Sequence, residues 1–274
     1  MAQECAEYEI IPVDNNSTDA TPDVIRKATH RFPALIRPTE ERSIQSSYAA
    51  RNAGIAHARG DVLAFIDADM TAPPDWLSRI AAAFTRTETD YLGYETEIVI
   101  PDGEKGLWGW YDQKMGLPSR YHYEQKQFVP TSCLAVRASL LETVGRFNER
   151  LISSGDREFG ERAHAHPDVE TTFTDEIVVY HPARTTFRAH VQKALRIGRG
   201  LVQVQSRAAS DQQAQTALSD LFDHLLPPDP RRIYRRADGE SPSQYALLYA
   251  MDWIIRYIRL YGALAEYVEA SVSE

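Results

Sequence analysis

Two carboxylates directly follow an apolar run in this chain of 274 residues. The run 62–66 (VLAFI) leads into Asp67 and Asp69, which are separated by one alanine. Carboxylates placed so close together repel each other and are costly to desolvate, so a compensating charge is expected. In an extended segment, residues i and i+2 point to the same side, so both acids could share one hard cation. Open sites rich in oxygen suit Mn²⁺ or Mg²⁺. A competing interpretation is that Asp69 only complements the start of the next helix.

Other acids also stand where an apolar run ends or a helix begins. Asp14 follows the first apolar run, and the string SGDREF contains Asp156 and Glu158. A carboxylate aimed from a helix start is well placed to accept a proton from a substrate hydroxyl. It is equally well placed to cap the helix, and the two interpretations are compatible.

The elements that position these acids alternate between strand and helix over the first two-thirds of the chain. This alternation predicts an α/β fold with a mostly parallel sheet flanked by helices. In such sheets ligands bind outside the carboxyl ends of the strands, where Asp14, Asp67 and Asp69 are expected. The strands are predicted at 8–13, 62–66, 91–101, 128–137 and 176–182, and the helices at 22–32, 43–60, 72–84, 138–147 and 153–166.

Composition excludes several classes of protein. A hydrophobic content of 43% with 25% charged residues is typical of a folded globule rather than a disordered chain. The net charge of −9 and the absence of a long basic run argue against a nucleic-acid partner. Two cysteines cannot form a disulfide framework. The sequence shows no signal peptide and no membrane-spanning apolar run, so we expect a cytoplasmic protein, or one held peripherally at the inner face of the cell membrane.

Three strings carry a resemblance to a known family. They are VDNNSTDAT, AARNAGIAHARGDVLAFIDAD and SSGDREFGERAHAH. Together they are similar to the family 2 glycosyltransferases, which are inverting enzymes of the GT-A (Rossmann-like) fold that use nucleotide-sugar donors. The resemblance implies a GT-A domain over residues 1–200 and a helical C-terminal extension over 201–274. The family's usual first strand and helix have no counterpart before Tyr8, so the strand before Asp14 is expected to expose an edge.

The resemblance also assigns roles on the donor side and to the base. It implies that Asp14 contacts the nucleotide, that Arg51 lies near the phosphates or the sugar, and that Asp67 and Asp69 bind the donor and its metal. A salt bridge is the competing interpretation for Arg51. In inverting transfer a base accepts the proton of the attacking hydroxyl, and we assign that role to Asp156.

Four further residues receive weaker assignments from the same resemblance. Glu158 and Arg162 are expected on the acceptor side, where Glu158 orients the acceptor or Arg162. His181 lies at the end of the strand at 176–182 and is a candidate third metal ligand, with a structural role as the alternative. Arg196 and Arg199 belong to a basic segment expected on the diphosphate side, with a solvated basic face as the alternative.

The sequence therefore predicts a glycosyltransferase that uses a UDP- or GDP-sugar with Mn²⁺ or Mg²⁺. The acceptor is a hydroxyl of a glycan, a lipid-linked molecule or a small molecule. Two other classes stay open. One is an impaired relative that acts as a scaffold in glycan assembly, and the other is a nucleotidyltransferase-like enzyme, whose glycine-rich loop is not visible here.

The last predicted helix, 245–267, has all its charges on one stripe. Asp252, Arg256, Arg259 and Glu266 follow at spacings of four, three and seven, and the rest forms a wide apolar arc. The arc fits a core or homodimer interface, or else a peripheral membrane contact. The stripe is not strongly basic, which weakens the membrane interpretation.

Overall fold

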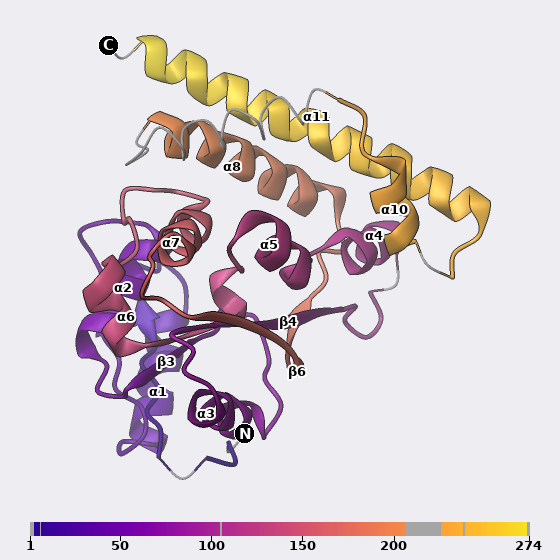
Figure 1. Cartoon of the computed structure of the whole chain (residues 1–274). Coiled ribbons are helices and arrows are strands. Elements are labelled where there is room, and N and C mark those ends of the chain that lie inside the picture. The colour runs from indigo at the N-terminus through magenta and orange to yellow at the C-terminus, as the bar shows by residue number, and fades with distance from the viewer. Residues whose placement is uncertain (1–2, 6, 105, 207–225, 238, 273–274) are drawn as a thin grey trace. The chain divides into compact units, whose positions relative to one another are not determined.

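The computed structural model describes residues 3–5, 7–104, 106–206, 226–237 and 239–272 of the chain. The chain forms two compact units. The first comprises Met1–Thr96 and Ser119–Val179, and the second comprises Glu97–Pro118 and Tyr180–Glu274. Each unit is described separately below, and Figure 1 labels their elements.

The first unit holds the sheet strands and the helices that pack on them. Helix α2 begins at Ser46, whose hydroxyl accepts a hydrogen bond from the Tyr48 amide, so this cap fixes where the helix starts. The helices are α1 (Thr21–Arg31), α2 (Ser47–His57), α3 (Trp76–Arg86), α5 (Ser119–Lys126), α6 (Ala138–Val144) and α7 (Gly155–His164), with a short 3₁₀ helix at Thr131–Cys133. The strands are β1 (Val13–Asp14), β2 (Thr39–Glu40), β3 (Val62–Phe65), β4 (Tyr91–Val99), β5 (Leu134–Arg137) and β6 (Thr171–Pro182), of which β4 and β6 continue into the second unit.

The strand predicted over 8–13 is shorter than expected. Only Val13 and Asp14 form β1, which pairs in parallel with β2, while Ile10 makes an isolated bridge to Ile36. The carbonyls of Ile10 and Pro12 both accept bonds from the neighbouring segment, so Pro12 stands where an amide donor is needed. Proline has no amide hydrogen, so the ladder is interrupted there.

The prediction of a mostly parallel sheet is wrong. The larger sheet has the order β3-β5-β4-β6, and β5 pairs antiparallel with both β3 and β4. The chain between β4 and β5 is long and passes through α4 (Leu107–Met115) and α5, so it can return to the sheet in either direction. The fold is therefore α/β with a mixed sheet flanked by helices, and β1 and β2 form a separate parallel pair. Among the described residues, β1 pairs only with β2, and an exposed edge before Asp14 stays a prediction.

Aromatic side chains fill the core of the first unit between the larger sheet and α7. Phe159 of α7 is fully buried and stacks on Tyr91 and Phe147, with ring centroids 6.3 Å and 4.5 Å apart. The hydroxyl of Tyr91 accepts a bond from the Val129 amide, so this buried polar atom is satisfied. The packing fixes α7 on the sheet and with it the residues at the start of α7.

The second unit is mainly helical. It contains α4 (Leu107–Met115), α8 (Phe187–Ser206), α10 (Pro230–Arg236) and α11 (Pro242–Val272). Helices α8 and α11 lie side by side (Figure 1), in close contact at two glycines. A Cβ atom on Gly198 would lie 2.0 Å from the carbonyl oxygen of Arg259, and one on Gly262 would lie 2.6 Å from that of Leu195. The boundary predicted at residue 200 falls inside α8, and the compact units divide the chain elsewhere. No helix within the described residues is long and apolar enough to cross a membrane.

Candidate active site

Arg51 and Asp67 form an ion pair in the first unit. Arg51 lies on α2, Asp67 follows β3, and Nη2 of Arg51 donates to Oδ1 of Asp67 over 3.0 Å. The guanidinium also lies over the ring of Tyr48, with 5.4 Å to its centroid. The salt bridge considered for Arg51 is therefore present, and it holds Arg51 beside one of the two predicted metal-binding acids.

The neighbouring Asn52 has a structural role. Its amide nitrogen donates to the carbonyl of Phe147 over 2.9 Å, and its side-chain oxygen accepts from the amide of Phe147 over 3.1 Å. These two bonds tie α2 to the segment that precedes α7. The positions of Arg51 and of the start of α7 are thereby coupled.

The two acids after β3 do not lie in an extended segment. The strand ends at Phe65, and the amide of Met70 donates to the carbonyl of Asp67 over 3.0 Å, which closes a turn over 67–70. The segment is therefore not the extended chain expected from the sequence, and a cation shared by Asp67 and Asp69 stays a prediction. Asp67 is half-buried and Asp69 is exposed, so both carboxylates reach solvent.

Asp156 begins α7 close to Arg51. The helix starts at Gly155, after Ser154 in the left-handed region with φ of 62°. A Cβ atom on Gly155 would lie 2.8 Å from the ring of Tyr48, so only glycine allows this approach of α7 to α2. Backbone strain and a glycine-dependent contact thus fix the carboxylate of Asp156 in place.

Burial and nearby charges together set the pKa of Asp156. Burial raises the pKa of the Asp156 carboxyl above its ordinary value, the Arg51 guanidinium lowers it, and the negative charge of Asp67 raises it. Arg51 pairs with Asp67 and lies over the ring of Tyr48, which contacts Gly155, so the three residues lie near one another. Their joint catalytic role stays a prediction. A raised pKa is typical of a carboxylate that can accept a proton during catalysis.

Tyr48 was not predicted as part of this site. It is buried, lies beneath Arg51 and contacts Gly155, and burial beside Asp156 raises the pKa of its hydroxyl. The sequence could have indicated this role, because Tyr48 lies three residues before Arg51 and residues at that spacing share one face of a helix.

Glu158 and Arg162 form a clamp inside α7. The guanidinium donates to both carboxylate oxygens of Glu158, over 2.8 Å and 3.1 Å, and also to the carbonyls of Val144 and Arg146. Glu158 is buried. Because Arg162 bonds both Glu158 and those two carbonyls, the pair holds the turn after α6 against α7. Of the two roles expected for Glu158, orienting Arg162 agrees with these contacts. A contact with the acceptor stays a prediction for both residues.

Asp14 is buried at the end of β1, beside α2. Its Oδ1 accepts a bond from the Ser17 amide over 3.1 Å, and Asn16 has a positive φ of 58°. These features form a turn before α1. Contact between Asp14 and a nucleotide stays a prediction.

The residues after β3 fit a hard divalent cation. Asp67 and Asp69 supply carboxylate oxygens in a turn that solvent reaches, as Mn²⁺ or Mg²⁺ requires when it keeps positions for water and phosphate. Within the part of the chain that the structure describes, no three His, Cys, Asp or Glu side chains gather as a metal site. His181 belongs to the second unit, where it is buried with Nδ1 2.6 Å from the carbonyl oxygen of Pro182. Metal ligation by His181 stays a prediction.

The basic segment predicted on the diphosphate side lies on α8 in the second unit. Arg196 is exposed, and Arg199 forms a 3.5 Å ion pair with Glu269 of α11 near the surface. Deeper in this unit, Asp112 is buried with Arg184 at 3.5 Å and Lys193 at 3.9 Å. Burial and the charge of Arg184 lower the pKa of Lys193 to about 8. The diphosphate role of Arg196 and Arg199 stays a prediction.

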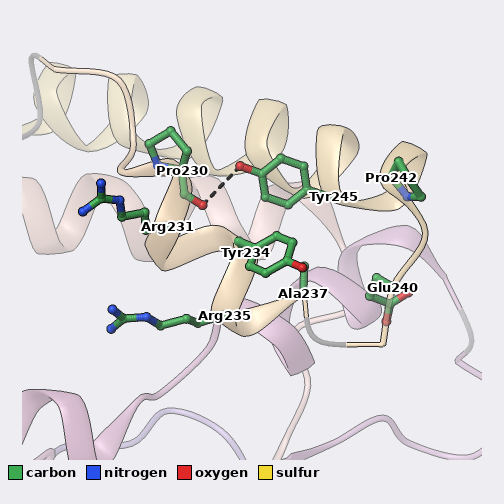
Figure 2. A pocket seen from close by; sticks show the side chains of 8 residues that line it. All are labelled: Pro230, Arg231, Tyr234, Arg235, Ala237, Glu240, Pro242 and Tyr245. Carbon is green, nitrogen blue, oxygen red and sulfur yellow. Dashed lines mark hydrogen bonds between the residues drawn. The ribbon is translucent and has the colours of Figure 1, made fainter.

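One pocket of about 720 Å³ lies in the second unit, where α10 meets the start of α11 (Figure 2). The hydroxyl of Tyr245 donates to the carbonyl of Pro230 over 3.1 Å at its edge. Its lining contains none of the predicted site residues and consists of Pro230, Arg231, Tyr234, Arg235, Ala237, Glu240, Pro242 and Tyr245.

Comparison with known families decides the classification. Residues 1–145, more than half of the chain, match the profile described as "Glycosyl transferase family 2". The chain belongs to glycosyl transferase family 2. A relative in Haloferax volcanii, the glycosyltransferase AglE, is 33% identical over 199 residues, which are 73% of this chain and 64% of AglE. The chain thus spans less than two-thirds of the length of that relative.

Solved structures agree on the fold. The mannosyltransferase PcManGT of Pyrobaculum calidifontis, in complex with GDP-Man and Mn²⁺, superposes with a TM-score of 0.59 at 18% identity, covering 94% of this chain and 77% of the other. TarS of S. aureus (residues 1–349), in complex with UDP-GlcNAc, gives 0.51 at 17% identity, covering 98% and 85%. These matches establish a GT-A fold for the chain.

Proposed function

We propose that this family member is an inverting glycosyltransferase that moves a sugar from a UDP- or GDP-sugar to a hydroxyl acceptor. One observation carries the proposal: Arg51 pairs with Asp67 and lies over the ring of Tyr48, which contacts Gly155 directly before Asp156. Arg51 and Asp67 lie within the residues that match the family. Relatives of the same fold were solved with GDP-Man and Mn²⁺ or with UDP-GlcNAc, which supports this class of donor.

On the donor side, Asp67 and Asp69 would hold Mn²⁺ or Mg²⁺. When bound, the cation neutralises the charge of the departing nucleotide diphosphate. Arg51 is fixed by Asp67 and by the Tyr48 ring, and its guanidinium presents donors suited to phosphate or sugar oxygens. Asp14 offers a carboxylate to the ribose or the base.

Asp156 acts as the base in the transfer step. The acceptor oxygen forms a bond to the anomeric carbon while the bond from that carbon to the diphosphate oxygen breaks. Asp156 accepts the proton of the acceptor hydroxyl, and the diphosphate leaves with the bonding electrons, so configuration inverts. Since burial raises the pKa of Asp156, its carboxylate is a better proton acceptor than an exposed aspartate.

A nucleotide screen tests the donor assignment. Thermal unfolding is measured with UDP, GDP and their sugars, with and without Mn²⁺, and the productive donor should raise the midpoint only when Mn²⁺ is present. Calorimetry then compares the wild type with Asp69→Ala, which should lose Mn²⁺-dependent binding by at least about tenfold. Unchanged binding in Asp69→Ala would refute the metal assignment.

Turnover separates an enzyme from a scaffold. Donor binding without release of nucleotide diphosphate, over a panel of glycan, lipid-linked and small hydroxyl acceptors, would favour the scaffold that the sequence leaves open. Release of diphosphate together with a β-linked product from an α-linked donor would support inverting transfer.

A further inference from the structure

Helix α11 carries a regular apolar stripe on its exposed side. The stripe, here called the α11 seam, has residues spaced alternately by three and four. All of them are exposed. The exposed fraction of the large side chains runs from 41% for Leu247 to 68% for Tyr261. The α11 seam consists of Leu247, Ala250, Ile254, Tyr257, Tyr261, Leu264 and Val268.

The second unit does not need the α11 seam for its own core. An adjoining side of α11 supplies that core through Leu248, Met251 and Ile255, all buried. The close crossing at Gly262 fixes this buried side against α8. The α11 seam is thus a second apolar face on a helix whose first face is already packed.

Within the described part of α11, the seam and the heptad positions that flank it hold no charged side chain. The positions that flank it in a heptad hold Trp253, Leu260 and Tyr267 on one side and Met251, Ile258 and Ala265 on the other. The charges of α11 are engaged elsewhere. Asp252 is buried with Arg232 at 3.6 Å and Arg256 at 3.7 Å, while Glu266 accepts a bond from Gln203 over 2.7 Å.

The spacing specifies a helical partner. Alternating steps of three and four give the heptad period of a helix pair, in which each side chain enters a gap between four residues of the partner. The α11 seam covers 22 residues from Leu247 to Val268, or about 32 Å of helix at 1.5 Å per residue. A partner helix of similar length and apolar character would cover it completely.

The exposed area matches one half of a stable dimer interface. Side chains of this size, about half exposed, each offer on the order of 100 Å². With Trp253 and Tyr267, the seam therefore offers roughly 800 Å² per copy, the area that each partner contributes to a standard interface. A monomer rarely leaves an apolar patch of this size uncovered.

We propose that α11 pairs with α11 of a second copy of this chain along the α11 seam. A second copy brings an identical uncharged stripe, so no like charges meet at the contact, and the pairing closes as a symmetric dimer. A membrane surface fits less well, because a helix lying on lipid carries lysine and arginine beside its apolar face. On α11, Arg256 faces Asp252 instead, and the exposed Arg231 and Arg235 belong to α10.

Light scattering after size exclusion tests the pairing. The full chain should be a dimer at ~10 µM, and Ile254→Glu and Tyr261→Glu should each raise the dimer dissociation constant at least ~100-fold. Tyr234→Glu is the matched control, because Tyr234 is 73% exposed but lies on α10, and this variant should stay dimeric. Circular dichroism checks that each variant keeps the wild-type fold.

A disulfide trap provides a second readout that does not depend on stability. Tyr257 lies near the middle of the α11 seam, so Tyr257→Cys in a Cys5→Ser background should form a disulfide-linked dimer in either direction of pairing. Leu247→Cys should do so only if the helices run parallel. Arg235→Cys, at an exposed position on α10, should stay monomeric on a denaturing gel.

Three results would overturn the proposal. The first is a wild-type monomer at ~100 µM. The second is a dimer that persists in both seam variants. The third is a monomer that sediments with vesicles of neutral and anionic phospholipid in the wild type but not in Ile254→Glu, which would assign the seam to a lipid surface.

Discussion

Gly155→Ala is the change that should most directly disturb the proposed base. An alanine Cβ would lie 2.8 Å from the ring of Tyr48, closer than carbon atoms pack, so α7 or the ring must move by several tenths of an ångström. Overpacking of this kind costs about 1–3 kcal/mol of unfolding free energy. In a chain of this size it should lower the unfolding midpoint by about 2–4 °C per kcal/mol.

The same shift should slow transfer more than it weakens donor binding. Asp156 follows Gly155 directly, so moving the start of α7 moves the carboxylate, and a displacement near 1 Å can cost about 100-fold in rate. The assay is release of nucleotide diphosphate at saturating donor and acceptor, together with calorimetric donor affinity. Gly106→Ala serves as the control, because a Cβ there meets nothing within 4 Å.

Removing the ring should remove the conflict. Tyr48→Ala alone is expected to cost about 3–5 kcal/mol, since a buried aromatic side chain is lost. In the double variant the Gly155→Ala cost should largely disappear, giving a coupling of about 1–3 kcal/mol in a double-mutant cycle. Strict additivity, or a Gly155→Ala variant with wild-type stability and turnover, would refute the contact as the constraint on α7.

Three further outcomes follow from the electrostatics and packing. Arg51→Met should move the acidic limb of the kcat–pH profile to higher pH, because Arg51 lowers the pKa of Asp156, and an unmoved limb would remove Asp156 as the titrating base. Lys193 loses its proton near its ordinary pKa of 10.5 in the unfolded chain but near 8 in the folded chain. Burying its charge therefore destabilises the folded chain fully below pH 8, and this destabilisation decreases between pH 8 and pH 10.5. Wild-type unfolding free energy should therefore rise over this window relative to Lys193→Met by at most ~1.4 kcal/mol per pH unit, and parallel curves would contradict it. Gly198→Ala should lower the unfolding midpoint at least as much as Gly155→Ala, because its Cβ would meet the Arg259 carbonyl at 2.0 Å, and unchanged calorimetric melting would show that α8 and α11 do not approach so closely.

Local features of the fold could be predicted from the sequence because they depend on nearby residues. Caps, prolines and apolar runs placed most helices and strands within a few residues. The direction of β5 could not be predicted, since an alternating apolar pattern specifies a strand but not its partner or its orientation. The sequence shows that Pro12 lacks an amide donor. It does not show whether the backbone nitrogen of Pro12 faces a neighbouring strand, which decides whether the strand is interrupted there.

The candidate site was predictable to a similar extent. The family strings contain Arg51, Asp67 and Asp156, and the structure brings these three together. Contacts set by tertiary packing were not predictable, such as Tyr48 under Gly155 and the clamp of Glu158 on Arg162. The apolar arc of the last helix was visible in the sequence. Its division into a packed side and the α11 seam needed the contacts of Gly262 with α8.

Substitution of the proposed base tests the central claim most directly. Asp156→Asn keeps the size of the side chain and removes its ability to accept a proton. Calorimetry should show donor affinity in the presence of Mn²⁺ within about twofold of wild type, while transfer to the acceptor falls at least ~100-fold. Wild-type turnover in Asp156→Asn would contradict the assignment of Asp156 as the base and, with it, the proposed mechanism.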